Sequence, residues 1–238
     1  MAAATVFVTG TDTGVGKTLI SRALLHRLRA AGLRAAGFKP VASGAERSGE
    51  ELRNDDARLL LTASSPGLDY AEVNPYCFEP PIAPHLAARE AGVEIELAAL
   101  DRAHDALAAR HDWVVVEGAG GWQVPLNARD TFADWVAGRG WPVILVVGMR
   151  LGCISHALLS AESIARRAPL LGWVANVLPP APERLRDNID TLRARLGAPL
   201  LATVPSGATA AEVGAALDWP ALTGEAPCVI PGPRRSPG

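Results

Sequence analysis

The residues with the clearest chemistry lie near the N-terminus, where a glycine-containing segment ends in Gly16, Lys17 and Thr18. A β-branched run at residues 5–8 precedes this segment and a helical pattern follows it, which is the context that a phosphate-binding loop requires. In such a loop Gly16 lets the backbone approach the phosphates, Lys17 reaches the terminal phosphates, and the Thr18 hydroxyl contacts Mg²⁺. The sequence therefore predicts a P-loop.

The spacing of this loop departs from the common pattern. Five residues separate Gly10 from Gly16 where four are usual, and Thr11 occupies the usual glycine position. The alternative interpretation is a strand-to-helix turn in which the Gly-Lys-Thr sequence is accidental. The strand before the loop and the helix after it favour phosphate binding.

A P-loop predicts that a nucleotide binds but not which reaction follows. The carboxylates of the chain are the next indication of that reaction. Glu117 follows the apolar run at residues 113–116, at the strand end where ligands of open α/β sheets bind, and there it can hold Mg²⁺ directly or through water. Asp56 belongs to the Asn-Asp-Asp sequence at residues 54–56, which is equally consistent with helix capping and with metal binding. Asp12 is as consistent with shaping the loop as with contacting a ligand.

Lys39 is a further candidate, because it follows a predicted strand at residues 34–38 and precedes the glycine-containing loop at residues 40–44. A lysine at a strand end beside phosphates would neutralise the charge that develops during phosphoryl transfer. The alternative is a solvated surface lysine, and the pattern alone favours that alternative.

The apolar pattern predicts the elements that bring these residues together. Short β-branched or aromatic runs suit strands buried on both faces, and they lie at residues 5–8, 113–116, 142–147, 173–177 and 200–204. Between them, apolar residues recur at a helical period within residues 17–31, 97–107 and 185–196. The alternation predicts an α/β fold, a three-layer P-loop NTPase-like arrangement with a mostly parallel sheet and helices on both faces.

The length suits one large domain or two small ones, and the regular alternation of strands and helices favours one domain. We expect one P-loop ATP-binding domain over residues 1–222 and a Pro-rich, disordered tail over residues 223–238.

Composition excludes several functional classes. The 238 residues include 23 Lys and Arg against 25 Asp and Glu, a formal charge of -2, so we expect neither a nucleic-acid nor a membrane partner. Cys77, Cys153 and Cys228 form no CxxC pair, which excludes a disulfide framework and a four-cysteine zinc site. The N-terminus carries no signal-peptide pattern, and we expect a cytoplasmic protein.

Motifs along nearly the whole chain resemble the ATP-dependent dethiobiotin synthetases of biotin biosynthesis. The lengthened P-loop is itself a feature of that family. The matching segments are residues 8–13, 15–18, 37–44, 52–54, 56–57, 73–76, 116–122, 132–135, 142–148, 151–154 and 172–176.

The resemblance implies a ligase that converts 7,8-diaminononanoate, CO2 and ATP with Mg²⁺ into dethiobiotin, ADP and phosphate. One amine captures CO2 as a carbamate, and the carbamate oxygen attacks the γ-phosphate. The second amine then attacks the mixed anhydride and closes the ureido ring. This chemistry needs mainly positioning and positive charge, because it brings two anions together.

The resemblance also implies the catalytic and substrate residues. Lys39 corresponds to the active-site lysine, with Lys17 supplying further positive charge. Thr13 and Ser43 correspond to residues that contact the diamine or the carbamate.

The metal and nucleotide sites follow from the same resemblance. Thr18, Asp56 and Glu117 are implied to surround Mg²⁺, and the Asn176 amide is implied to bind adenine. The residues implied to bind ATP are Gly14, Val15, Gly16, Lys17, Thr18, Leu19, Asp56, Glu117, Gly118, Ala119, Gly120, Asn176, Val177, Pro205, Ser206, Gly207 and Glu212.

The family implies a homodimer in which the carboxylate tail of the substrate reaches the loop with Gly152, Cys153 and Ile154 of a second subunit. A helix starting near Ile154 would present free N–H groups to that carboxylate. We interpret Cys153 as a small packing residue and His156 as structural rather than as a general base.

The chain departs from the family at four positions. The family often has an acid at the position of Gly14, an asparagine at Ser155, a tyrosine at Asn188 and an aromatic residue at Ser206. These changes affect base stacking and carboxylate capture. Because Gly14 keeps its backbone N–H, we expect nucleotide binding to survive.

Two other functions fit a P-loop protein. A partitioning or assembly ATPase would act as a switch, but such proteins usually add a second lysine inside the loop, and residues 12–15 contain none. A small-molecule kinase would act without CO2 and release a phosphorylated product.

Overall fold

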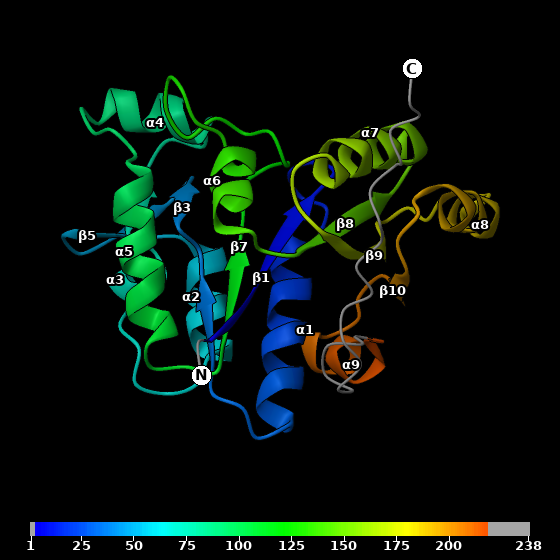
Figure 1. Ribbon diagram of the computed structural model, residues 1–238, viewed down its shortest axis with the longest axis horizontal. Coiled ribbons are helices and arrows are strands. Elements are labelled where there is room, and N and C mark those ends of the chain that lie inside the picture. Colours follow the sequence, from blue (N-terminus) through cyan, green and yellow to red (C-terminus); the bar gives the residue numbers. More distant parts are fainter. Residues whose placement is uncertain (1–2, 219–238) are drawn as a thin grey trace, which may run out of the picture.

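The computed structural model describes residues 3–218, and its central element is a sheet of six strands in the order β10-β9-β8-β1-β7-β2 (Figure 1). Every strand pair in this sheet is parallel. The strands are β1 (Ala4–Gly10), β2 (Ala35–Phe38), β7 (Trp113–Glu117), β8 (Val143–Met149), β9 (Leu170–Val177) and β10 (Leu200–Val204).

These strands form where the sequence has short, uninterrupted apolar runs. All seven residues of β8 are buried, as are the last six of β1, so side chains on both faces of the sheet are covered. The predicted strands are therefore present, with ends that differ by at most three residues from the predicted ranges.

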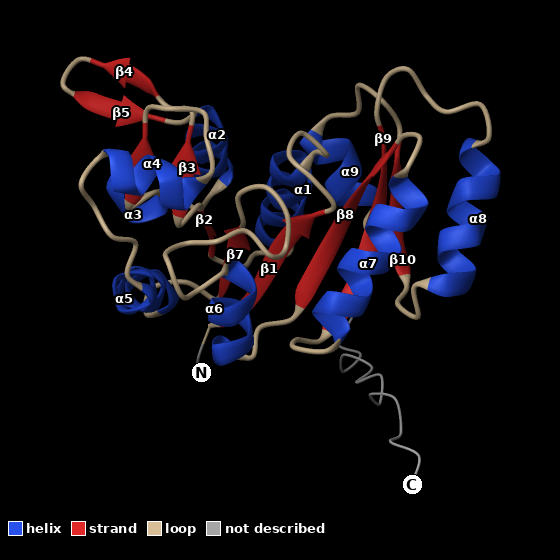
Figure 2. Ribbon diagram, turned by 90° about the horizontal axis from the view of Figure 1, so that it is seen from above, coloured by secondary structure: helices blue, strands red, loops and turns tan. Residues whose placement is uncertain are grey.

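Helices cover both faces of the sheet, which confirms the predicted three-layer α/β fold (Figure 2). One face packs against α1 (Lys17–Ala30), α2 (Asp55–Ala63) and α9 (Ala210–Ala216). The other face packs against α4 (Pro84–Glu90), α5 (Leu97–Ala108), α6 (Phe132–Arg139), α7 (Cys153–Ala165) and α8 (Leu185–Arg195).

Two small sheets that the apolar pattern does not predict follow β2. β3 (Val41–Ser43) pairs in parallel with β6 (Tyr76–Phe78), and α3 (Tyr70–Val73) immediately precedes β6. β4 (Glu46–Ser48) and β5 (Glu51–Arg53) form an antiparallel hairpin. Three-residue strands carry too little apolar periodicity to be recognised in a sequence.

The register of the sheet places the candidate residues at one edge. Val8 of β1 lies opposite Glu117 of β7, and Val116 of β7 lies opposite Phe38 of β2. The P-loop after β1, the carboxylate that ends β7 and Lys39 after β2 therefore leave the sheet side by side. This is the carboxyl edge at which open α/β sheets bind ligands.

The predicted domain boundary at residue 222 and the predicted tail over residues 223–238 lie outside the described residues. Within residues 3–218, the helices fall short of the length and apolarity that crossing a membrane requires.

A buried histidine joins the start of β1 to helix α5. His104 is 3% exposed, its Nε2 lies 3.0 Å from the Thr5 hydroxyl, and its ring centroid lies 4.4 Å from that of Trp141. Burial lowers the pKa of His104; the hydrogen bond with Asp105 opposes this shift, and the Arg139 guanidinium adds to it. The ring is therefore neutral in the folded protein at neutral pH.

We expect His104 to make folding stability depend on pH between 7.5 and 5.5. Its pKa is lower in the folded than in the unfolded chain, so the unfolded chain binds the proton first and stability falls as the pH drops below about 6.5. The loss is at most about 1.4 kcal/mol per pH unit for this one proton. Urea unfolding at the two pH values measures it.

The control is a histidine that is exposed. His104→Gln, which keeps a polar group near Thr5, should flatten the pH dependence, whereas His156→Gln should retain the wild-type slope. An unchanged slope in His104→Gln would show that His104 takes up its proton equally in the folded and the unfolded chain.

Candidate active site

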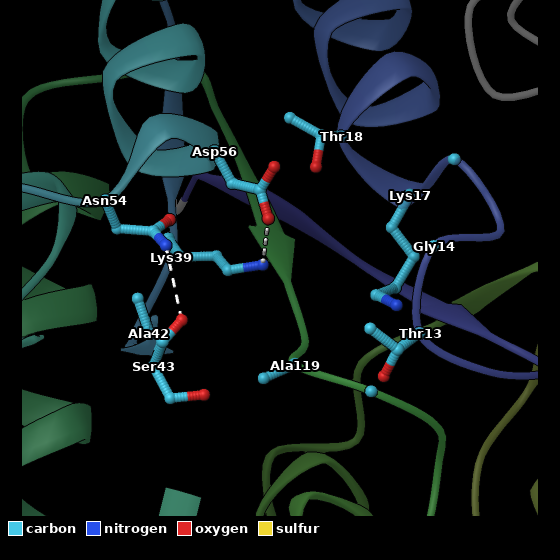
Figure 3. A pocket seen from close by; sticks show the side chains of 12 residues that line it. Thr13, Gly14, Lys17, Thr18, Lys39, Ala42, Ser43, Asn54, Asp56 and Ala119 are labelled. Carbon is cyan, nitrogen blue, oxygen red and sulfur yellow. Dashed lines mark hydrogen bonds and ion pairs between the residues drawn. The ribbon is translucent and has the colours of Figure 1, made fainter. Parts of the chain in front are cut away.

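A cavity of about 350 Å³ opens at the carboxyl edge of the sheet, between the P-loop and the segment that follows β2 (Figure 3). The chain has two lysines, Lys17 and Lys39, and both line this cavity. The other lining residues are Thr13, Gly14, Gly16, Thr18, Ala42, Ser43, Asn54, Asp56, Ala119 and Gly120.

The P-loop holds its shape through glycines in the left-handed region. Gly14 has φ 73° and Gly16 has φ 96°, and Gly16 directly precedes the first residue of α1. The first turn of α1 contains no acidic residue, so its free N–H groups and its dipole are available to an anion. This is the local structure that phosphate binding requires.

Asn176, the penultimate residue of β9, supports the loop from a strand two places away from β1 in the sheet. Its Nδ2 donates a 2.8 Å hydrogen bond to the carbonyl oxygen of Val15, and the side chain is 6% exposed. A Cβ on Gly16 would lie 2.2 Å from that Nδ2. The glycine is therefore required both by its φ and by the close approach of Asn176.

Asp12 shapes the loop, as one of the two interpretations of this residue predicts. Its Oδ1 accepts a 2.7 Å hydrogen bond from the backbone N–H of Thr13, and its carboxylate pairs with Arg150, just after β8. Lys17 Nζ donates to the Asp12 carbonyl oxygen at 2.9 Å. Burial, followed by repulsion from Lys39, lowers the pKa of Lys17 to about 8.

The other wall of the cavity is built around two carboxylates and Lys39. Lys39 Nζ donates to Glu117 Oε1 at 2.6 Å, to Asp56 Oδ2 at 3.3 Å and to the Gly118 carbonyl oxygen at 3.3 Å. Lys39 is 3% exposed, so the surface-lysine alternative is wrong. A lysine at this depth persists because all three of its N–H donors have partners.

The electrostatics of this wall favour charged forms. Burial lowers the pKa of Lys39, but the carboxylates of Glu117 and Asp56 outweigh burial and hold that pKa above its ordinary value. Burial likewise raises the pKa of Asp56, and the ammonium of Lys39 reverses the shift, so the pKa lies below its ordinary value. Lys39 therefore stays a cation and Asp56 an anion at neutral pH.

The helix that carries Asp56 is capped by its neighbour. The Asn54 side chain accepts a 3.3 Å hydrogen bond from the backbone N–H of Ala57, which makes Asn54 the N-cap of α2. The Asp56 carboxylate is therefore not engaged in capping and points into the cavity (Figure 3). For the Asn-Asp-Asp sequence, the structure gives the capping role to the first residue.

The donor set fits a divalent cation. Glu117 is fully buried, its Oε1 accepts a 2.9 Å hydrogen bond from the Thr18 hydroxyl, and its Oε2 has no hydrogen-bond partner among the described residues. A buried carboxylate oxygen without a partner, beside a hydroxyl and a second carboxylate, suits Mg²⁺. Within residues 3–218 no group of three or more His, Cys, Asp and Glu residues could form an all-protein metal cage, and Mg²⁺ beside phosphates needs none.

The remaining predicted residues lie outside this cavity. Pro205, Ser206, Gly207 and Glu212 line a separate cavity of about 480 Å³ between β10 and α9. The Glu212 carboxylate accepts a 2.8 Å hydrogen bond from the Thr209 backbone N–H in a capping box. Six further residues predicted for ATP do not line the main cavity either: Val15, Leu19, Glu117, Gly118, Asn176 and Val177.

The loop predicted to take a substrate carboxylate also lies outside the cavity. Gly152, with φ 92°, is the N-cap residue of α7, Cys153 is 2% exposed, and Ile154 is half-buried. Leu151 beside them is 99% exposed. In the single chain described, the loop contributes nothing to the cavity lining.

Sequence reasoning missed two functional contacts. Asn54 lines the cavity and caps α2, a role that its position just before two acidic residues and an apolar run indicates. Arg150, just after the adjacent strand β8, pairs with Asp12 of the P-loop. No local signal in the sequence predicts that contact, because the two residues are 138 positions apart.

We expect Gly16→Ala to weaken nucleotide binding by more than about tenfold, because its Cβ must displace Asn176 or the loop. Gly32→Ala is the matched control: Gly32 has φ 78°, so the change imposes a similar backbone strain, but a Cβ there meets no atom within 4 Å. Calorimetric titration with ATP compares the two variants. Equal affinities would contradict the assignment of Gly16 to a phosphate site.

Comparison with known proteins gives a consistent family. Residues 4–212 match the family described as the AAA domain. The ATP-dependent dethiobiotin synthetase BioD of Pseudomonas paraeruginosa is 56% identical over 216 residues, which cover 89% of this chain and 95% of the relative. The protein of the same name from Aromatoleum aromaticum is 52% identical over 219 residues, which cover 90% and 96%.

Solved structures agree at the level of the fold. A ParA family ATPase from Chlorobium tepidum superposes with a TM-score of 0.51 at 17% identity, covering 86% of this chain and 84% of that chain. The septum site-determining protein MinD of Pyrococcus horikoshii, complexed with Mg-ADP, superposes with a TM-score of 0.50 at 16% identity, covering 86% and 82%. At these identities the likeness shows a shared fold alone.

Proposed function

Because the chain belongs to the family of the ATP-dependent dethiobiotin synthetases, we propose that its main cavity is where 7,8-diaminononanoate, CO2 and ATP become dethiobiotin, ADP and phosphate. The protein is an ATP-dependent ligase of biotin biosynthesis. The roles of its individual residues are our proposal.

One observation carries this proposal: the chain's two lysines line one cavity from opposite walls, Lys17 from the P-loop and Lys39 from the segment after β2 (Figure 3). Transfer of a phosphoryl group to a carbamate brings two anions together. Cations fixed on both sides of the meeting point stabilise that charge without reorganisation during the reaction.

The P-loop wall binds the triphosphate. The backbone N–H groups of Gly14, Val15 and Gly16 and the start of α1 face the phosphates, and Lys17 exchanges its hydrogen bond with the Asp12 carbonyl for the terminal phosphates. The positive charge that Lys17 needs is restored by the phosphates themselves, which raise a pKa that burial holds near 8.

The opposite wall binds the carbamate. An amine nitrogen of the diamine bonds to the carbon of CO2, and a carbamate oxygen then attacks the γ-phosphorus while the bond to the ADP oxygen breaks. Lys39 and the hydroxyls of Ser43 and Thr13, which line the cavity, orient the carbamate. The second amine attacks the carbamoyl carbon and releases phosphate, which closes the ring.

We assign Mg²⁺ to the carboxylates between the two walls. Thr18, Asp56 and Glu117 would hold it, and it would neutralise phosphate charge. The unpartnered Glu117 Oε2 supports this assignment. The adjacent backbone of Gly118, Ala119 and Gly120 lies beside the same site.

We assign the base to the space between Asn176 and the second cavity. Val177 and Leu19 flank Asn176 and the loop in sequence, and Pro205, Ser206, Gly207 and Glu212 line the second cavity. The Asn176 amide makes one hydrogen bond within the described residues, so an N–H and the oxygen remain for adenine. Ser206 offers no ring on which a base could stack.

We propose that the enzyme is a cytoplasmic homodimer. Leu151 and Leu159, at 99% and 64% exposed, present apolar surface at the start and middle of α7. At the start of the same helix the backbone N–H of Cys153 donates to the Arg150 carbonyl oxygen at 3.0 Å, whereas those of Gly152 and Ile154 have no backbone partner among the described residues and suit a carboxylate delivered from a second subunit. Among the described residues Cys77 and Cys153 are free thiols, as in a reducing compartment.

The partitioning ATPase is not favoured as a function. Such ATPases share the fold at 17% identity or less in the two solved structures above, whereas the synthetases match most of the sequence at 52–56% identity.

We expect purified protein incubated with ATP, Mg²⁺, bicarbonate and 7,8-diaminononanoate to form dethiobiotin, detected by mass spectrometry. ADP release should depend on both the diamine and CO2, because the carbamate is the phosphoryl acceptor. A kinase would release a phosphorylated diamine without bicarbonate, and a switch ATPase would release ADP without the diamine. Either of those results would reject the ligase.

Substitutions of Lys39 separate its chemistry from its structural role. Lys39→Arg keeps a cation beside Glu117 but changes the geometry of its donors, so turnover should fall by at least about 100-fold while the protein stays folded. Lys39→Ala should lower turnover further and destabilise the fold by about 3–5 kcal/mol, because Glu117 is then a buried carboxylate without its cation.

The control for these variants is Arg47→Ala, which removes an exposed ion pair with Glu79 on the neighbouring hairpin. Steady-state turnover and urea unfolding should both stay near wild type for this control. Near-normal turnover in Lys39→Arg and Lys39→Ala would remove Lys39 from the mechanism.

A further inference from the structure

A chain of polar groups lies behind the cavity, formed by the half-buried Tyr70 on α3 and the buried Asn74 just after it. Neither residue lines the cavity. The Tyr70 hydroxyl accepts a 2.7 Å hydrogen bond from the backbone N–H of Asn54 and donates a 2.9 Å hydrogen bond to Asn74 Oδ1. Asn74 is 3% exposed, and its Nδ2 donates to the carbonyl oxygens of Lys39 at 2.7 Å and Tyr76 at 3.0 Å.

Both ends of this chain are attached to the cavity wall. At one end Asn74 holds the backbone carbonyl of Lys39, and the Lys39 backbone N–H donates to the Val73 carbonyl oxygen at 2.8 Å. The peptide groups on both sides of the Lys39 Cα are thus fixed by the segment at residues 73–74. The directions that the Lys39 side chain can take are therefore set by a backbone that these hydrogen bonds hold in place.

At the other end the Tyr70 hydroxyl holds Asn54. Asn54 caps α2, which carries Asp56, and its Nδ2 donates to the Ser43 carbonyl oxygen at 3.4 Å. The Arg53 guanidinium lies 4.1 Å from the centre of the Tyr70 ring and covers it. One phenol and one amide thus connect the segments that carry Lys39, Ser43 and Asp56.

We propose that Tyr70 and Asn74 are positioning residues for the reaction, which set the relative placement of Lys39, Ser43 and Asp56 before any ligand binds. This inference rests on the proposed function for its effect on turnover. Each hydrogen bond in the chain satisfies a buried group, so removing the phenolic oxygen leaves the Asn54 N–H and Asn74 Oδ1 without their partner. The wall must then relax, and a shift of about 1 Å can cost about 100-fold in rate.

The chain of hydrogen bonds makes no contact with the P-loop, and this predicts a specific kinetic pattern. Among the described residues, the side chains of Tyr70 and Asn74 hydrogen-bond to each other and to residues 39, 54, 76 and 77, whereas the loop spans residues 10–18. Tyr70→Phe should lower kcat about 10- to 100-fold and raise the KM for ATP by a much smaller factor, because the P-loop contacts to the phosphates are kept and only the Asp56 side of the metal site shifts. A variant that merely destabilised the fold would lower its melting temperature without changing kcat well below that temperature.

The matched control is Tyr76→Phe, the same removal of one oxygen six residues along the chain. The Tyr76 hydroxyl makes two long hydrogen bonds, 3.5 Å to the Glu94 carbonyl oxygen and 3.4 Å from the Glu96 N–H, and none toward the Lys39 side of the wall. It should keep kcat within about twofold of wild type. Asn74→Ala should lower kcat like Tyr70→Phe, and the double variant should cost little more than either single one, because both act through one chain.

A readout without substrate separates this inference from the proposed function. With [ε-¹³C]lysine the unliganded protein gives two signals, one from Lys17 and one from Lys39. Tyr70→Phe should move the Lys39 signal and leave the Lys17 signal in place, while Tyr76→Phe moves neither. If wild-type protein made no dethiobiotin, the proposed function would fail and the spectrum would still test the positioning.

The inference is overturned if Tyr70→Phe keeps wild-type kcat, or if the Lys39 signal does not move. Should Asn74→Ala fail to fold, Tyr70→Phe alone decides, because Phe fills the same apolar space and loses only the hydroxyl. Strictly additive losses in the double variant would also contradict a single chain of contacts.

Discussion

A carboxylate with no solvent exposure must find its compensation within the protein, and Glu117 finds it in the two segments on either side of β7. Its Oε1 receives the Thr18 hydroxyl from the P-loop helix and the Lys39 ammonium from the segment after β2. These segments are separated by more than twenty residues, and the carboxylate joins them. The cavity has two walls at a fixed separation because one buried charge holds both.

The parallel sheet makes that arrangement possible. β7 lies between β1 and β2, so a residue at its carboxyl end is flanked by the P-loop and by Lys39 without any insertion or long loop. β9 contributes Asn176 at the same edge, and Asn176 holds the Val15 carbonyl. The strand order therefore brings residues that are far apart in the sequence next to one another, and the loops add the remaining contacts.

Much of this was predictable from the sequence, for physical reasons that differ from element to element. The strands of the main sheet are covered on both faces, so their apolar runs are continuous and easily recognised. The P-loop is recognisable because Gly16, Lys17 and Thr18 are adjacent in the sequence, and together they provide the backbone turn and the side chains that phosphate binding requires.

Other features depend on tertiary contacts and leave no local signal. A lysine at a strand end is usually solvated, and only the approach of Glu117 and Asp56 explains the burial of Lys39. The capping role fell to Asn54 rather than to an aspartate because the Tyr70 hydroxyl and the Ser43 carbonyl fix it. The hairpin of β4 and β5 is too short and too exposed to produce a pattern.

The most direct test of the central role of Glu117 is a pH titration of the two lysines in the unliganded protein, followed by ¹³C NMR at their Cε atoms. The account predicts that Lys17 titrates near pH 8 and that Lys39, held between Glu117 and Asp56, stays protonated above its ordinary pKa of 10.5. In Glu117→Gln the Lys39 transition should move down, because burial is then opposed by one carboxylate only. A Lys39 that titrates below 10.5 in the wild-type protein, or that is indifferent to the loss of Glu117, would contradict the account.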